Sequence, residues 1–177
     1  MRRASSASRR PDGYAAVNLV SRLLPPQHVV LGMDAGSKKR LFEQVGLLFE
    51  NSRQIPRSRV FDSLFDREKL GSTGLGYGVA IPHGRIKTIK EAVCAFVRTA
   101  TPIPFEAPDG VPVSLVFAML VPEHATEAHL ELLSELAQMF SDARLREALA
   151  TTDDVQAAHR LITEWSPYAP PQRTAAL

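Results

Sequence analysis

The chain has 177 residues, of which 45% are hydrophobic and 23% charged, and this length suffices for one globular domain with a substantial core. Its formal net charge of +2 gives no case, on charge alone, for a nucleic-acid-binding or membrane-binding surface. No apolar stretch is long enough to cross a bilayer, and Cys94 is the only cysteine, so we expect an inert core thiol and a reducing cytosol.

The two ends of the chain differ in composition from the part between them. Residues 1–16 are basic and serine-rich but lack the apolar segment of a secretory signal, and residues 167–177 are rich in proline and small residues. We expect both ends to be disordered tails around one domain at residues 17–166. A start codon assigned too far upstream would give the N-terminal tail the same appearance.

The first half of the domain predicts a short turn, a strand and two helices. Residues 17–24 form the turn or short helix, and β-branched residues favour a strand over residues 28–32, with His28 expected at the surface. Apolar residues recur at helical spacing over residues 37–51, where Ser37 is the expected N-cap, and again over residues 58–69. Gly71 is placed to end the second helix.

The most unusual stretch runs from Arg67 to Arg85 and reads REKLGSTGLGYGVAIPHGR. Its glycines reach positive φ angles and let another group approach the backbone: Gly71, Gly74, Gly76 and Gly78. Pro82 fixes its own φ and favours an extended Ile81. We therefore expect a strand that ends abruptly, presents His83 at its tip and leaves open space beside Gly84.

The residue types of this stretch suit the binding of an anion. A histidine presented in this way is able to act as a nucleophile, a general base or a metal ligand. The N–H groups of the loop and the hydroxyls of Ser72 and Thr73 suit a phosphoryl group. No Gly-Lys-Ser/Thr tripeptide closes the stretch and the glycines have the wrong spacing for a dinucleotide fingerprint, so we expect no nucleotide site.

The second half of the domain predicts two strands followed by three helices. The strands are expected over residues 92–99 and 111–121, the second buried on both faces, with Asp109-Gly110 suited to a tight hairpin and with Glu106 and Asp109 as solvated turn carboxylates. The helices are expected after a loop within residues 122–140, over residues 142–149 and over residues 153–165, with Thr126 capping the first and Thr152 or Asp153 the last. Interleaved strands and helices indicate an α/β fold.

Three further residues have an ordinary interpretation on the pattern alone. Arg67 in the last turn of a helix is typically a solvated cation favoured by the helix dipole. His129 on an apolar helix face is typically a hydrogen-bonded core residue. His124, in a loop, is expected at the surface.

The segment GSTGLGYGVAIPHGR, with REKLG before it and PEHATEAHLELLSELAQMF downstream, resembles the enzyme IIA domain of the bacterial phosphotransferase system, and most of all its nitrogen-regulatory branch. The resemblance covers roughly residues 19–165. It implies a mixed sheet with helices on both faces, and a phosphoryl group accepted by His83 from the phosphohistidine of the carrier protein HPr. It also implies that Arg67 binds the phosphate and that His129 is the second active-site histidine.

The same resemblance implies a phosphate-binding loop and a regulatory role. The loop would comprise Ser72, Thr73, Gly74 and Gly84, and no metal or cofactor is needed. The protein would be cytoplasmic, and its phosphorylation state would control target proteins such as potassium-transport or kinase components, with no nucleic acid bound and no membrane insertion.

Three alternatives remain open. A sugar-type IIA of the fructose–mannitol group would pass its phosphate to a permease domain. A transfer-inactive binding module is the second, because Tyr77 stands where relatives commonly have a smaller polar or acidic residue. A metal hydrolase built on the histidines is the third and least favoured, because His83 and His129 make a poor zinc set without further ligands.

Overall fold

The computed structural model describes residues 18–124 and 127–167, so the predicted tails and the Thr126 cap lie outside the described residues apart from Pro167. Short 3₁₀ turns at Val20–Arg22 and Pro26–His28 come first. The strands are β1 Val29–Met33, β2 Gly74–Gly76, β3 Val79–Ala80, β4 His83–Ile86, β5 Val93–Ile103 and β6 Val113–Pro122. The helices are α1 Lys38–Arg53, α2 Arg57–Glu68, α3 Glu127–Ser141, α4 Ala143–Thr151 and α5 Val155–Thr163.

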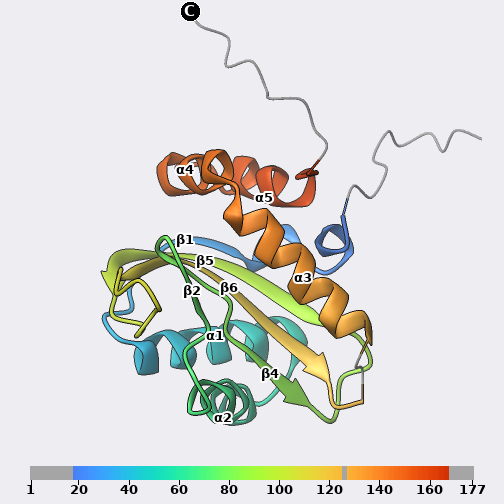
Figure 1. Cartoon of the computed structure of the whole chain (residues 1–177). Coiled ribbons are helices and arrows are strands. Elements are labelled where there is room, and N and C mark those ends of the chain that lie inside the picture. The colour runs from blue at the N-terminus through green and yellow to red at the C-terminus, as the bar shows by residue number, and fades with distance from the viewer. Residues whose placement is uncertain (1–17, 125–126, 168–177) are drawn as a thin grey trace, which may run out of the picture.

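The strands form one mixed sheet of six strands in the order β1-β5-β6-β3-β2, with β4 also paired to β6. The β5–β6 pair is antiparallel, whereas β1 runs parallel to β5, and both β3 and β4 run parallel to β6. Helices α1 and α2 cover one face of the sheet and α3, α4 and α5 cover the other (Figure 1). The α/β class and the three-layer arrangement predicted from the sequence are therefore confirmed.

Two hydrophobic cores lie on the two faces of the sheet. Side chains alternate along a strand, so Phe96 and Phe117 pack with Phe140 beneath α3. Their neighbours on β5 and β6 point the other way and pack with Phe42 and Phe49 of α1. Nearly every residue of β6 is buried, as its apolar run predicts.

Several local predictions need correction. His28 is fully buried and not at the surface. Its Nδ1 lies 2.8 Å from the Cys94 carbonyl oxygen and its Nε2 lies 2.7 Å from the Ser52 hydroxyl. Both polar atoms of the ring therefore have hydrogen-bond partners inside the protein, which makes its burial possible. The turn at Asp109-Gly110 belongs to a longer connection over residues 104–112, so the β5–β6 hairpin is not tight. The α5 cap is Asp154, whose carboxylate accepts from the Gln156 N–H.

The strand that was expected to end at His83 ends earlier. β3 stops at Ala80, and the chain crosses Ile81 and Pro82 before β4 begins at His83, with both strands parallel to the same neighbour β6. Proline has no N–H to give to a sheet ladder, which explains the interruption. His83 is thus at the start of a strand rather than at the tip of one.

In the part of the chain that the structure describes, no helix combines the length and the hydropathy needed to cross a membrane.

Candidate active site

The His83 ring is fixed by the backbone just before it. Its Nδ1 lies 2.9 Å from the Ile81 carbonyl oxygen. A carbonyl only accepts, so Nδ1 carries the proton and the lone pair of the neutral ring is on Nε2. The ring is half-buried. The fold therefore presents Nε2 as the nucleophilic atom.

His129 lies beside His83 although it is 46 positions away in the sequence. Their ring centroids are 5.8 Å apart and the rings meet edge to face at 81°. His83 comes from the start of β4, whereas His129 is in the first turn of α3, the helix that follows β6. Since β4 pairs with β6, the connection from β6 to α3 brings the second histidine to the first.

Two arginines lie close enough to His83 to act on its charge. Arg67, in the last turn of α2, donates from Nη1 to the Gly71 carbonyl oxygen at 2.9 Å. Arg85 lies two residues after His83 in β4, on the same face of that strand, and donates from Nη1 to the Glu123 carbonyl oxygen at 3.2 Å. The prediction from the sequence did not include Arg85. The motif does indicate it, because residues i and i+2 of a strand share a face and Arg85 follows His83 by two residues.

The pKa of His83 is lowered from its ordinary value of 6.5. Burial of the ring is the largest cause, because desolvation penalises the charged form. The positive charges of Arg67 and Arg85 lower the pKa further, whereas the hydrogen bond to Ile81 and the negative charge of Glu68 raise it. The site therefore favours a neutral, nucleophilic ring.

The loop hydroxyls expected at the phosphate are occupied in holding the loop itself. Thr73 donates its hydroxyl at 2.6 Å and its N–H at 3.1 Å to the Glu68 carboxylate. Ser72 donates its hydroxyl to the Phe105 carbonyl and accepts from the Gly74 N–H at 3.1 Å. A phosphate contact of Ser72, Thr73 and Gly74 stays a prediction.

The space beside Gly84 is filled, contrary to the expectation that it is open. A Cβ at this position would lie 2.8 Å from the backbone carbonyl carbon and oxygen of Ser63 in α2. Glycine is needed here because β4 and α2 approach each other closely. Gly84 therefore sets the distance between the strand that carries His83 and the helix that carries Arg67.

Glu68 is a residue of this site that sequence reasoning missed. Its carboxylate is almost fully buried, accepts from Thr73 and forms an ion pair of 2.9 Å with the ammonium of Lys38 at the start of α1. Lys38 also lies over the Phe105 ring, 4.6 Å from its centroid. Glu68 lies among charged residues at the end of a helix, and nothing in that local sequence indicates that its side chain is buried.

Tyr77 lies at the turn between β2 and β3, six residues before His83. Its φ is +58°, its N–H donates to the Asp109 carboxylate at 2.8 Å, and the Arg146 guanidinium lies 4.4 Å from its ring centroid. Asp109 also accepts from the Val111 N–H, and the Tyr77 hydrogen bond is the main cause of its lowered pKa. Asp109 is exposed, as expected of a turn carboxylate, but it also fixes this turn.

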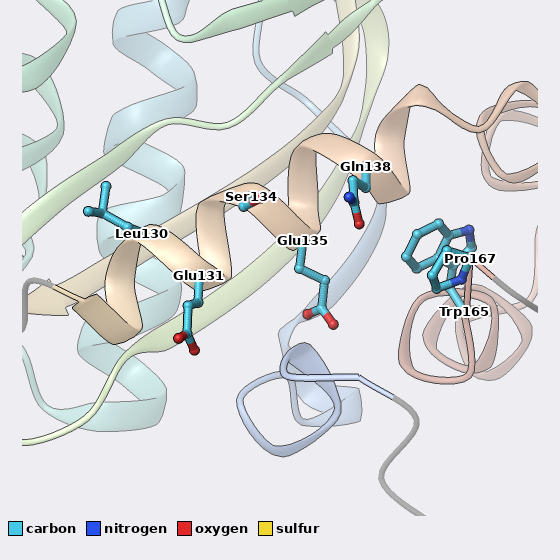
Figure 2. A pocket seen from close by; sticks show the side chains of 7 residues that line it. All are labelled: Leu130, Glu131, Ser134, Glu135, Gln138, Trp165 and Pro167. Carbon is cyan, nitrogen blue, oxygen red and sulfur yellow. The ribbon is translucent and has the colours of Figure 1, made fainter.

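The other polar features lie away from the histidine pair. His124 is exposed as expected, and His159 Nε2 lies 2.8 Å from the Leu24 carbonyl oxygen. An open hollow on the outer side of α3 does not include His83 or His129 (Figure 2); it is lined by Leu130, Glu131, Ser134, Glu135, Gln138, Trp165 and Pro167. Within residues 18–124 and 127–167, no three His, Cys, Asp or Glu side chains come together as a metal site.

Comparison with known proteins decides the family. The sequence model of the phosphoenolpyruvate-dependent sugar phosphotransferase system, EIIA 2, matches residues 22–165. The chain belongs to this EIIA family. The match spans every residue of the site described above and confirms the resemblance carried by the stretch before His83.

Individual members of the EIIA family extend this result. The chain is 38% identical over 148 residues to a nitrogen regulatory protein of Pseudomonas aeruginosa, covering 82% of this chain and 95% of that protein. The crystal structure of the nitrogen regulatory protein IIA-Ntr from Neisseria meningitidis matches with a TM-score of 0.79 and 53% identity, covering 82% and 100% of the two chains. A fructose-specific EIIA component of Haloferax volcanii is 30% identical over 146 residues, or 82% and 95% of the two chains.

Proposed function

We propose that His83 accepts a phosphoryl group at Nε2 from the phosphohistidine of an HPr-type carrier, and that the phosphorylation state of the chain regulates target proteins in the cytoplasm. The observation that carries the proposal is the Ile81 carbonyl on Nδ1, which leaves the Nε2 lone pair facing away from that bond. The similarity to nitrogen regulatory proteins supports the regulatory role. The targets proposed are potassium-transport or kinase components, as the resemblance noted in the sequence implies.

The proposed step exchanges one nitrogen–phosphorus bond for another. The bond from phosphorus to the donor ring breaks, and the donor nitrogen keeps its electron pair, while the Nε2 lone pair of His83 forms the new bond. The Nδ1 proton stays on His83 and remains shared with the Ile81 carbonyl. Such a transfer needs positioning and charge stabilisation and no further covalent chemistry from the protein.

The neighbours of His83 supply that stabilisation in the proposal. Arg67 and Arg85 neutralise the phosphoryl oxygens, and the planar fork of a guanidinium suits two oxygens at once. In the proposal His129, whose ring centroid lies 5.8 Å from that of His83, donates to the same oxygens after phosphorylation. Catalytic roles are thus proposed for His83, His129 and Arg67, with Arg85 added by the structure.

Mass spectrometry of the full chain after mixing with phosphorylated HPr tests this assignment. The wild-type chain should gain one acid-labile phosphate on His83, and His83→Ala should gain none. His124→Ala is the matched control, because this histidine is exposed, and it should be labelled like the wild type. Full labelling of His83→Ala would overturn the assignment, and an unlabelled wild type would favour the transfer-inactive alternative.

A sugar-type IIA function is the second candidate, and the fructose-specific relative favours it. Both candidates share the labelling of His83 and differ in what removes the phosphate. Adding a fructose-type permease IIB domain to the labelled chain separates them, because rapid discharge would favour the sugar-type function.

The position of Tyr77 weighs against the inactive alternative. Val79 and His83 pair with Leu115 and Met119 of β6, four residues apart on that strand, so at about 3.3 Å per residue they lie about 13 Å apart along the sheet, and Tyr77 lies in the turn before Val79. Its ring also contacts Arg146 of α4. At that distance Tyr77 would lie at the rim of a docked carrier protein rather than over the reacting histidine.

A further inference from the structure

A continuous series of contacts connects the start of α1 to the Nδ1 atom of His83. The Lys38 ammonium pairs with the Glu68 carboxylate at 2.9 Å, and Glu68 accepts the N–H and the hydroxyl of Thr73. The Thr73 carbonyl accepts the Ile81 N–H at 3.0 Å. The Ile81 carbonyl then accepts the Nδ1–H of His83 at 2.9 Å.

Glu68 is buried in a way that makes these contacts strong. Its side chain is only 3% exposed, so its negative charge must be offset by bonded donors. Hydrogen bonds to an ionised carboxylate are shorter and stronger than those between neutral groups. Losing one donor would leave a buried charge partly unsatisfied, and the loop at Thr73 would shift to compensate.

Glu68 and Arg67 hold the same loop from opposite sides. Arg67 donates to the Gly71 carbonyl on the exposed side, whereas Glu68 holds Thr73 on the buried side. The two residues are adjacent at the end of α2, so this helix end determines where the loop lies.

We infer that Glu68, paired with Lys38, is a positioning residue for phosphoryl transfer: by fixing Thr73 it fixes Ile81, whose carbonyl holds the His83 ring with Nε2 as the acceptor atom. Glu68 itself does not contact the phosphate. This inference rests on the proposed function, because it assigns a role in the reaction of His83.

The Thr73 hydroxyl offers a mild way to weaken this series of contacts. Thr73→Val removes the hydroxyl, retains the N–H and changes the shape little, so the chain is expected to fold. In ¹⁵N NMR spectra of the unphosphorylated chain, wild-type His83 should be protonated at Nδ1, and Thr73→Val should increase the share of ring protonated at Nε2. Phosphoryl transfer from HPr should slow by about tenfold to a hundredfold, which is typical of small misplacements of a reacting group.

Matched variants separate positioning from a direct contact with the phosphate. Thr73→Ser restores the hydroxyl and should restore both the Nδ1-protonated ring and the transfer rate. Lys38→Met should act like Thr73→Val, whereas Lys39→Met removes the exposed neighbouring lysine and should have no effect. If Thr73 instead touched the phosphate, its loss would slow transfer without changing the ring of the unphosphorylated chain.

Each result for the variants of Thr73, Lys38 and Lys39 either supports the inference or overturns it. A changed ring protonation together with slow transfer in Thr73→Val and Lys38→Met, but not in Thr73→Ser and Lys39→Met, supports the inference. A wild-type ring in Thr73→Val, or equal effects of Lys38→Met and Lys39→Met, would overturn it. The proposed function itself fails separately, if the wild-type chain takes no phosphate at His83, and the NMR result would still decide the positioning role of Glu68.

Discussion

At the scale of single residues, the environment of His83 favours the neutral ring that the proposed attack on phosphorus needs. Burial is the first cause of its lowered pKa, and the charges of Arg67 and Arg85 add to it. These arginines therefore have two compatible effects. In the proposed transfer, they favour an unprotonated His83 beforehand and neutralise the phosphoryl group afterwards.

The lowered pKa predicts the pH dependence of transfer. The rate of phosphoryl acceptance should decline as the pH falls, with its inflection below the ordinary value of 6.5, because His83 is lost as a nucleophile when it is protonated. The unfolding free energy should also decrease as the pH falls. The contribution of His83 is present above pH 6.5 and is lost as the pH falls below 6.5, because the unfolded state binds the proton more tightly than the folded state does. Single-turnover rates and an NMR titration of His83 measure both.

The Arg67→Gln variant is the control for this prediction. Removing its positive charge should raise the pKa of His83 and move the inflection of the rate profile to higher pH, in addition to any loss of rate. A wild-type inflection at or above 6.5, or no movement in Arg67→Gln, would contradict the electrostatic account.

At the scale of elements, the sequence predicts those parts that have their own periodicity. The two long strands and all five helices lie within a few residues of their expected bounds, because apolar spacing in each is set by the face that it buries. The contacts between elements leave no such pattern in the sequence. The burial of His28 depends on Ser52 and Cys94, and the burial of Glu68 depends on Lys38, all distant in sequence.

Gly84 is another residue whose contacts with a different element could not be predicted from the sequence. A glycine after His83 predicts open space, but α2 fills that space. His129 is recognisable through the family resemblance, because a histidine on an apolar helix face is ordinary by itself. Its position 5.8 Å from His83 follows from the path of β6 and α3, which no local pattern reports.

The contact between β4 and α2 predicts the effect of a single methyl group. Gly84→Ala should lower the unfolding free energy by about 1–3 kcal/mol, the usual cost of overpacking, because the added Cβ would lie too close to the Ser63 backbone. It should also slow phosphoryl transfer, since it separates the strand of His83 from the helix of Arg67. Urea unfolding and single-turnover rates measure the two effects.

Gly36→Ala is the matched control for Gly84→Ala. A Cβ added at Gly36 would meet open space, and the φ of Gly36 is not positive, so the substitution should leave stability and transfer nearly unchanged. If both variants were equally stable, the close approach of β4 and α2 would not be the constraint on Gly84.

At the scale of the whole molecule, the two cores share one sheet and should therefore unfold together. Successive residues of β5 and β6 contribute to opposite cores, so neither helical layer has a sheet of its own. A domain built in this way is expected to unfold in one cooperative transition. A substitution that destabilises the α1–α2 side should therefore also destabilise the α3–α5 side.

The single tryptophan, Trp165, allows that coupling to be measured, because it packs against the core on the α3–α5 side. Phe49→Ala removes a fully buried ring on the opposite face and should lower the unfolding free energy by about 3–5 kcal/mol. Phe140→Ala, on the same face as Trp165, should cost a similar amount. In both variants the fluorescence and circular dichroism transitions should shift together in urea. A fluorescence transition that Phe49→Ala leaves in place would show two independently stable layers.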